Sequence, residues 1–397
     1  MYDRGHPSTD PFNDLANGLI FQKNGIEWKQ CRHFFDQFFT STCIRSYYPM
    51  LSRYGDILEN ILEKQNETGS GFDIEPIFQH ISFDVISELV FGSGKTQCLI
   101  DGGSKYLDAF TYCLEDATNR FLQRAFLPSF LIWESAKYKQ QIKLFRSLVT
   151  DSIDNHAPRN DQSLKNSMLG TLLESQNVPE FLKNEKNMIT HLVSILFAGH
   201  DTTKNLMTWL THFLSINQDV QDRLYLELSS ITINNQVQID KLDSLTLLNH
   251  IVKETLRLRP SAVELARVPI KDHVVTWTDE TGKERSHTLR KGSLISYNVF
   301  QTHHHPSNWI DRPNEFLPDR WLEPKGGAAS EYCFVPFGFG PRRCLGEKLA
   351  LLEAKYVLSR IMSRWNILPV DGWKVEVSQA AVMGTRNGLG VVLRERS

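Results

Sequence analysis

The sequence predicts a mainly α-helical protein with a small β-rich lobe. Apolar residues recur at spacings of three and four over residues 28–258, as at Leu206, Trp209 and Phe213, and this spacing is typical of helices that bury one face. After Pro260 the pattern changes to alternation and frequent prolines, which favours strands and loops. With 397 residues and 41% hydrophobic content, the chain can bury a large core, which excludes disordered and collagen-like classes.

Charge and composition narrow the class of protein. Lys and Arg number 44 and Asp and Glu number 46, for a net charge of -2, so we expect no nucleic-acid partner bound through phosphate neutralisation. Residues 1–10 lack the apolar core of a secretory signal. The longest apolar run, 191–199, is far below the roughly 20 residues that span a bilayer. Six scattered cysteines therefore predict free thiols in an intracellular, reducing compartment.

The helical part contains two polar stretches, at residues 60–71 and 154–166. Both are rich in Asn, Gln, Gly, Lys and Asp, which predicts surface connections between helices.

The β-rich part begins with alternation at residues 274–278 and a turn at 281–283. We expect residues 294–299 to pair back as a strand. Five prolines over 306–336 exclude a long helix there. Helical spacing resumes at 345–364, and the valine-rich tail predicts a hairpin.

The most informative segment, residues 337–346, reads FGFGPRRCLG. This glycine-rich loop presents Cys344 just before a helix, where backbone N–H groups favour the thiolate that a metal-ligating sulfur requires. Gly340 and Gly346 allow close backbone approach, and Arg342 offers a cation for a carboxylate. A Gly-x-Arg-x-Cys pattern alone would indicate only a glycine-rich turn before an ordinary buried cysteine. Four fixed positions ahead of a helix instead favour Cys344 as a metal ligand.

This segment resembles the haem-binding signature of the cytochrome P-450 family, Phe-x-x-Gly-x-Arg-x-Cys-x-Gly, at every fixed position. The resemblance covers nearly the whole chain and implies one cytochrome P-450 domain over 1–397. Its helical part would occupy about 24–260, and its β-rich and haem-loop part about 261–397. It also implies that Cys344 is the axial ligand of haem b (iron protoporphyrin IX), with Phe337 and Gly346 beside the cofactor.

Glu254 and Arg257 form a Glu-x-x-Arg pattern that places both side chains on one helix face. Taken alone, this is a surface ion pair of little energetic value. The resemblance implies a buried pair completed by Arg320, with a structural role in holding the segment that leads to the cysteine loop. Asp319 and Trp321 stand where the family has Glu and Phe.

Residues 198–203 read AGHDTT inside an otherwise apolar helix, where Gly and Thr have poor helix propensity. Thr hydroxyls can bond to the preceding turn and Gly permits distortion, which predicts a local groove. Asp201 could instead cap a new helix, but the helical spacing of 192–197 argues against this. The resemblance places the segment across the distal haem face, with Asp201 and Thr202 as catalytic residues that relay protons through water.

Trp28 and Arg32 lie one helical turn apart, after a helix-start turn at residues 24–25. On its own, such a pair is usually surface packing. The resemblance implies that Trp28, Arg32, Arg267 and Arg342 bind the haem propionates.

His303 is the first of three consecutive histidines, a pattern that suggests a zinc site. We reject a zinc site, because adjacent side chains on an extended segment point in opposite directions and cannot bind one ion together. The resemblance instead packs His303 near the segment ahead of the cysteine loop.

The resemblance implies the reaction. A thiolate ligand favours O–O cleavage, so one oxygen atom of O2 enters a C–H or double bond of a lipophilic small molecule. Electrons must come from outside, because the chain has no Gly-x-Gly-x-x-Gly fingerprint. An NADPH-dependent reductase is implied, steered by Lys29, Arg343 and Lys348. The resemblance to full-length relatives implies a monomer at the endoplasmic reticulum surface, in a secondary-metabolite or lipid pathway.

Substrate contacts follow from motif position. The segments concerned are mostly apolar, and Glu264 could hydrogen-bond a polar substituent or be a solvated loop acid. The six candidates are Leu196, Phe197, Ala262, Val263, Glu264 and Val382.

The N-terminal part departs from the family, which usually has a longer segment ahead of the Trp-x-x-x-Arg pattern. Only 27 residues precede Trp28, so we expect that the usual anchor and first strands are lacking and that a sheet edge is open. The alternative hypothesis is a truncated, catalytically silent haem-binding protein. An enzyme that rearranges peroxides without a reductase is disfavoured by Asp201 and Thr202.

Overall fold

The computed structural model describes residues 2–3, 7–67, 69–92, 94–124, 126–128, 131–154, 167–234, 236–279, 281–379 and 382–396. Most of the predicted connection at 154–166 lies outside these residues. The helices of the first half are α1 (Asn13–Ala16), α2 (Ile26–Asp36), α3 (Ser41–Ser46), α4 (Tyr48–Asn66), α5 (Glu75–Phe91), α6 (Cys98–Asp101), α7 (Lys105–Gln123), α8 (Ala136–Asp154) and α10 (Met168–Glu174). They are followed by α11 (Glu185–Ile216), α12 (Gln218–Ser229), α13 (Thr246–Leu258), α14 (Val299–His304) and α15 (Glu347–Met362).

Short strands and 3-10 helices complete the fold, so the predicted class of mainly helical protein with small sheets is confirmed. The strands are β1 (Tyr2–Asp3), β2 (Phe72–Asp73), β3 (Thr232–Ile233), β4 (Gln236–Val237), β5 (Glu264–Pro269), β6 (His273–Thr278), β7 (Glu284–Leu289), β8 (Ile295–Asn298), β9 (Trp365–Pro369), β10 (Val377–Gln379), β11 (Met383–Thr385) and β12 (Gly390–Glu395). The 3-10 helices are η1 (Pro7–Phe12), η2 (Gln37–Phe39), η4 (Glu180–Lys183), η5 (Ile239–Ser244), η6 (Pro318–Leu322), η7 (Pro324–Gly327), η8 (Glu331–Cys333) and η9 (Gly340–Arg342).

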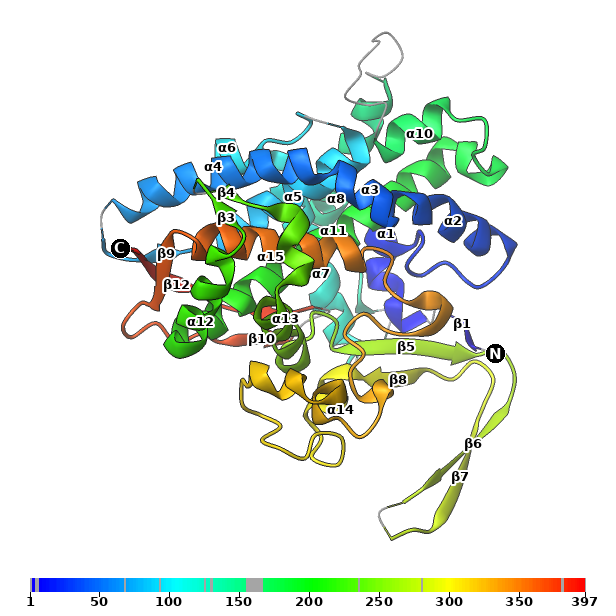
Figure 1. Cartoon of the computed structure of the whole chain (residues 1–397). Helices are drawn as coiled ribbons and strands as arrows, with labels where there is room; N and C mark the ends of the chain where they lie inside the picture. The colour runs from blue at the N-terminus through cyan, green and yellow to red at the C-terminus, as the bar shows by residue number, and fades with distance from the viewer. Residues whose placement is uncertain are drawn as a thin grey trace.

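Helix α11 runs through the middle of the helical body, and α15 crosses it (Figure 1). The side chain of Asn184 caps the N-terminus of α11 by accepting a hydrogen bond from the Asn187 N–H. A Cβ atom on Gly199 would lie 2.8 Å from Ile86, so glycine here permits α11 to pack closely on α5. Because α11 continues from 185 to 216, Asp201 lies inside it and does not cap a new helix.

The strands of the β-rich part pair differently from the prediction. β8 forms as predicted, but it pairs with β5, with Glu264 opposite Asn298. The partner of β6 is β7, in a hairpin that projects from the body (Figure 1). Sequence analysis missed β7 because its ERSHTL sequence lacks apolar alternation, and most of its residues are exposed. β1 pairs with the far end of β5, with Tyr2 opposite Pro269.

Two further segments correct or confirm the sequence analysis. The predicted connection at 60–71 is wrong over its first part, since α4 continues to Asn66. The polar side chains there accompany buried Leu58 and Leu62, so the helix keeps one apolar face. The tail hairpin is confirmed as β10–β11, while β12 pairs with β9 and β2.

The long segment between α14 and α15 contains only short 3-10 helices, as its prolines predict. Among the described residues, no helix combines the length and the apolar content needed to cross a membrane.

Candidate active site

Cys344 lies in a tight loop just before α15. Gly338 and Gly340 adopt φ angles of 70° and 68°, which side chains rarely tolerate. The loop closes where the Cys344 N–H donates to the Phe337 carbonyl at 2.9 Å. Gly346 has an ordinary φ of -84°, so the conformational need for glycine falls on Gly338 and Gly340 rather than on Gly346. All six cysteines are described, and Cys344 alone is exposed.

The electrostatics of Cys344 differ from the sequence-based expectation. Although Cys344 is exposed, desolvation by the protein around it raises the pKa of the thiol, and this outweighs the lowering by the Gly346 and Glu347 backbone N–H groups. The Glu347 carboxylate raises the pKa further, while Arg32 lowers it. The helix N-terminus therefore does not by itself make a thiolate. A coordinated metal cation would, because it deprotonates a ligating thiol.

Behind this loop, a buried carboxylate joins three segments of the chain. Glu254 on α13 is fully buried and lies 2.8 Å from Arg257 and 2.9 Å from Arg320. The Trp321 indole N–H and the Leu317 backbone N–H also donate to it, each at 3.0 Å. A buried charge is stable only when it is paired and hydrogen-bonded in this way. The structure thus brings Glu254, Arg257 and Arg320 together as the sequence predicts.

Both arginines of this cluster also hold backbone of the segment ahead of the cysteine loop. Arg257 donates to the carbonyls of His303, Pro313 and Glu315, and Arg320 donates to those of residues 311–312. The buried His303 ring accepts from the Val335 N–H at 2.9 Å. These contacts fix the path of the chain between α14 and the cysteine loop.

On the other side of the loop, Trp28 and Arg342 are in contact. The Arg342 guanidinium carbon lies 3.8 Å from the centre of the Trp28 ring. Arg342 also donates to Asn24 Oδ1 at 2.6 Å and to the Gln22 carbonyl at 2.7 Å. Sequence reasoning missed Asn24 as an acceptor, although it precedes the predicted helix start, which the structure confirms at Ile26.

Arg32 and Arg267, the other two predicted propionate donors, differ in their partners. Arg32 donates to the Arg343 carbonyl at 2.7 Å and pairs with Asp36 at 3.0 Å. Arg267 on β5 is half-buried and donates to the Ala266 carbonyl. Desolvation lowers the pKa of Arg267, and no ion pair with an acid is found for it in the part of the chain that the structure describes. A half-buried guanidinium of this kind suits an anionic ligand.

Asp201 and Thr202 lie on α11. The Thr202 hydroxyl donates to the Ala198 carbonyl at 2.7 Å, the back-bond that the sequence predicts. Asp201 pairs with Lys204 at 3.0 Å. Burial tends to raise the pKa of Asp201, but Lys204, His200 and Asn205 bring it below its ordinary value. Sequence reasoning missed Lys204, whose signal is a lysine three residues after an acid in an apolar helix.

The candidate substrate residues come together around α11 only in part. Leu196 is fully buried, and the Phe197 ring lies 6.3 Å from the Phe110 ring. Glu264 is an exposed residue of strand β5 rather than a loop acid, and it accepts from the Ser296 hydroxyl at 3.0 Å.

The segments carrying Ala262, Val263 and Val382 converge on α11. The Ser261 hydroxyl donates to the Thr202 carbonyl at 3.0 Å, and the Met383 N–H donates to the Ser261 carbonyl at 2.9 Å. Ala262, Val263 and Val382 adjoin these contacts in the chain and are all partly buried.

The residues of this site fit a haem group. A porphyrin iron needs one accessible sulfur donor and its propionates need cations, and the chain supplies Cys344 and a half-buried Arg267 without an acid partner among the described residues. The backbone N–H groups next to the sulfur are the hydrogen bonds that tune such a ligand.

Comparison with known proteins identifies the family. The family model described as "Cytochrome P450" matches residues 3–389. Cytochrome P450 3A6 of Oryctolagus cuniculus and cytochrome P450 3A5 of Homo sapiens are each 27% identical to this chain, over 86% of it and 68% of their own length. Cytochrome P450 3A29 of Sus scrofa is 28% identical, over 91% of this chain and 72% of its own. The chain belongs to the cytochrome P450 family and is a haem-dependent monooxygenase that uses O2, a redox partner and a lipophilic substrate.

Proposed function

We propose that the chain inserts one oxygen atom of O2 into a lipophilic small molecule by hydroxylation or epoxidation, with Cys344 as the axial ligand of haem b. The exposed residue Cys344, in its tight glycine loop, is the observation that carries this proposal. When bound, the haem activates oxygen for transfer. The chain itself functions as one domain over 1–397, helical over about 24–260, with the cysteine loop in the β-rich part over about 261–397.

The protein residues around the cofactor bind and orient it. Trp28, Arg32, Arg267 and Arg342 would hold the propionates, and Phe337 and Gly346 would line the proximal side. The Glu254 cluster keeps the cysteine loop in place from behind, so its role is structural. Rigid support of this kind is what places a ligating sulfur to within a fraction of an ångström.

Asp201 and Thr202 move protons in the proposed reaction. A carboxylate beside a hydroxyl can accept a proton from solvent water and pass it on at the alcohol oxygen. The Thr202 hydroxyl, which now donates to Ala198, can rotate to serve as that donor.

The substrate would lie against the apolar residues near α11. Leu196, Phe197, Ala262, Val263 and Val382 suit an apolar molecule, and Glu264 could orient a polar substituent from the pocket edge. We propose that the reaction belongs to a secondary-metabolite or lipid pathway.

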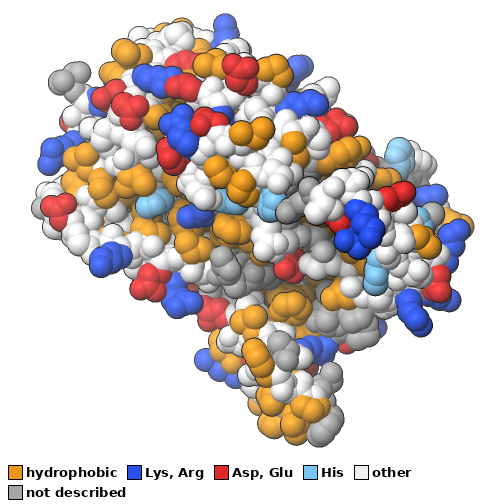
Figure 2. Space-filling model, turned by 90° about the horizontal axis from the view of Figure 1, so that it is seen from below, with side chains coloured by type: hydrophobic (Ala, Val, Ile, Leu, Met, Phe, Trp, Pro, Cys, Tyr) orange, Lys and Arg blue, Asp and Glu red, His pale blue; other side chains and the backbone are white. Residues whose placement is uncertain are grey.

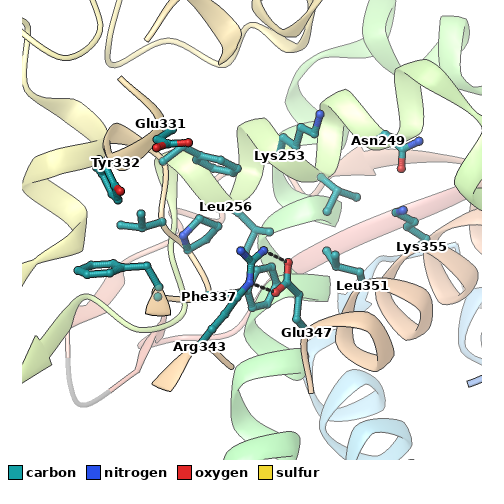
Figure 3. A pocket seen from close by; sticks show the side chains of 16 residues that line it. Asn249, Lys253, Leu256, Glu331, Tyr332, Phe337, Arg343, Glu347, Leu351 and Lys355 are labelled. Carbon is teal, nitrogen blue, oxygen red and sulfur yellow. Dashed lines mark hydrogen bonds and ion pairs between the residues drawn. The ribbon is translucent and has the colours of Figure 1, made fainter. Parts of the chain in front are cut away.

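The redox partner is proposed to be an NADPH-dependent reductase that docks over the cysteine loop. A cavity of about 500 Å³ lies there between α13, α15 and the loop (Figure 3). Its wall carries Lys253, Leu256, Tyr332 and Phe337, and at one edge Arg343 pairs with Glu347 (Figure 3). Lys29 and Lys348 are also exposed. The wall of the cavity carries the cations Lys253, Arg343 and Lys355 and the acids Glu331 and Glu347, and we propose that the exposed cations attract an acidic partner.

We also propose that the protein is a monomer that works at the endoplasmic reticulum surface. Exposed apolar side chains gather between α7 and α8, with Phe126 87% and Trp133 75% exposed. The face seen from below carries a projecting part covered mainly by hydrophobic side chains (Figure 2). Aromatic side chains of this kind insert into membrane interfaces.

Co-expression with an NADPH-dependent reductase, followed by mass spectrometry of extracted products, tests the proposal. We expect products that are one oxygen atom heavier than their substrates, with the label incorporated from ¹⁸O2. Products lacking the label, or no products across lipophilic substrates despite a thiolate-type carbon monoxide spectrum, would overturn it.

A further inference from the structure

Lys204 lies between two carboxylates that come from different helices. Its ammonium group is 3.0 Å from Asp201 on α11 and 3.1 Å from Glu75 on α5. The three side chains are only 14%, 16% and 12% exposed, in the order Lys204, Asp201 and Glu75. Ion pairs removed from water interact much more strongly than surface pairs. One cation is thus shared between two acids.

Glu75 is itself anchored to the strand next to a candidate substrate residue. The Thr385 hydroxyl on β11 donates to its carboxylate. On the Asp201 side, the amide of Asn205 adds a hydrogen bond to the Asp201 carboxylate. Asn205 is 1% exposed, and its Oδ1 lies so close to Gly384 that a Cβ atom there would come within 2.5 Å. The chain of contacts from Thr385 to Asp201 therefore runs through side chains with little freedom to move.

Lys204 dominates the electrostatics of Asp201. Burial alone would raise the pKa of Asp201, and the ammonium of Lys204 is the largest influence that lowers it. The neighbouring His200 ring also lowers the pKa of Asp201. Burial lowers the pKa of His200 itself to about 3, so Lys204 is the group of the two that is charged near neutral pH. The pKa of Lys204 is raised by Asp201 and Glu75 despite burial, so Lys204 stays an ammonium and donates no proton.

We propose that Lys204 is a positioning residue of the proton relay, which holds Asp201 as an oriented carboxylate. Glu75 competes for the same ammonium group and so weakens the effect of Lys204 on Asp201. The proposal rests on the relay role proposed above for Asp201 and Thr202. Protons enter from solvent water, reside on Asp201 and leave by way of Thr202, while Lys204 keeps its own proton throughout.

The two neighbours of Asp201 give predictions of opposite sign. Lys204→Met removes the shared cation, so the pKa of Asp201 should rise by about one unit or more. Glu75→Gln removes the competing acid, so Lys204 acts on Asp201 alone and the pKa of Asp201 should fall. General loss of packing would not move the pKa in opposite directions in the two variants.

The test uses the haem-loaded protein with ¹³C-labelled aspartate. Infrared spectra recorded over a pH series give the titration of Asp201, whose band is identified by its absence in Asp201→Asn. Lys183→Met is the matched control, because Lys183 forms an exposed i, i+3 pair with Glu180 at 2.8 Å. Lys204→Arg should keep the pKa of Asp201 near that of the unaltered protein. Peroxide released per NADPH consumed is the second readout, and Lys204→Met should increase it about twofold or more.

The outcomes separate this inference from the proposed relay. Unchanged Asp201 titration in both Lys204→Met and Glu75→Gln, or shifts of the same sign, would overturn the role of Lys204. If Lys204→Met does not yield folded protein, the sign of the shift in Glu75→Gln still decides the question, and Lys204→Arg serves as the variant that should show no shift. Unaltered peroxide release in Asp201→Asn would instead overturn the relay itself.

Discussion

The guanidinium of Arg342 stacks on the indole of Trp28, with 3.8 Å between its central carbon and the ring centre. This contact joins α2 to the cysteine loop, two segments at opposite ends of the chain. Arg342 also binds Asn24 and the Gln22 carbonyl, so one planar cation holds the start of α2 against the loop.

Arg342→Lys should therefore weaken this junction although the charge is kept. Lysine cannot reproduce a stacked, forked guanidinium, and we expect a loss of about 1–2 kcal/mol in the free energy of unfolding. Urea denaturation followed by tryptophan fluorescence measures it. Arg343→Lys is the control, since Arg343 is exposed and pairs only at the surface with Glu347. Equal effects of the two substitutions would contradict the special role of Arg342.

Glu254→Gln should strongly destabilise the protein, because Glu254 is the buried carboxylate at the centre of its cluster on α13. It leaves the buried guanidiniums of Arg257 and Arg320 without their carboxylate, which costs about 3–5 kcal/mol. Asp319→Asn breaks the exposed pair with Arg223 and should cost less than about 1 kcal/mol. Denaturation midpoints of the two variants provide the comparison, and similar midpoints would show that the Glu254 cluster does not hold the fold.

Thr202→Ala should divert electrons from product to peroxide. The hydroxyl is the proposed proton donor at this point of α11, and its loss should raise peroxide release per NADPH about tenfold. Thr208→Ala is a matched control, because the Thr208 hydroxyl makes the same kind of back-bond, donating to the Lys204 backbone carbonyl at 3.0 Å. Unchanged coupling in Thr202→Ala would remove Thr202 from the relay.

Protein stability should fall in acid partly because of His303. Burial lowers the pKa of His303 to about 3 from an ordinary value of 6.5. Between these values the unfolded chain binds a proton that the folded chain does not, so the free energy of unfolding rises with pH and levels off above about 6.5. One such group contributes a slope of roughly 1.4 kcal/mol per pH unit within this window.

His303→Gln should reduce this slope, measured as urea midpoints at pH 5, 6 and 7. His305→Gln serves as the control, because His305 is exposed. An unchanged slope in His303→Gln would mean that His303 does not govern the acid sensitivity.

The sequence predicts the position of an element or site residue most accurately where a motif and a periodic pattern agree. The helical spacing of 345–364 and the cysteine motif together place α15 and Cys344 as the structure has them. The Glu254, Arg257 and Arg320 cluster is likewise assembled from separate segments. These features depend on local spacing or on a resemblance that spans the whole chain.

Contacts between distant polar residues could not be predicted. The pairing of β8 with β5 depends on which strand edge is free to accept a partner in the folded protein. The exposed strand β7 lacks the apolar alternation by which a strand is recognised. The raised pKa of Cys344 reflects desolvation in the folded protein, which the helix-terminus argument does not include. Lys204 and Glu75 meet only because α5 packs on α11.

The reduced carbon monoxide difference spectrum of the purified protein, produced in cells supplied with hemin, shows whether the Cys344 thiolate ligates the haem iron. We expect the red-shifted band of a thiolate-ligated haem, retained in Cys333→Ala, whose cysteine is buried, and abolished in Cys344→Ala. A protein that binds no haem, or a Cys344→Ala variant that keeps the thiolate band, would contradict it.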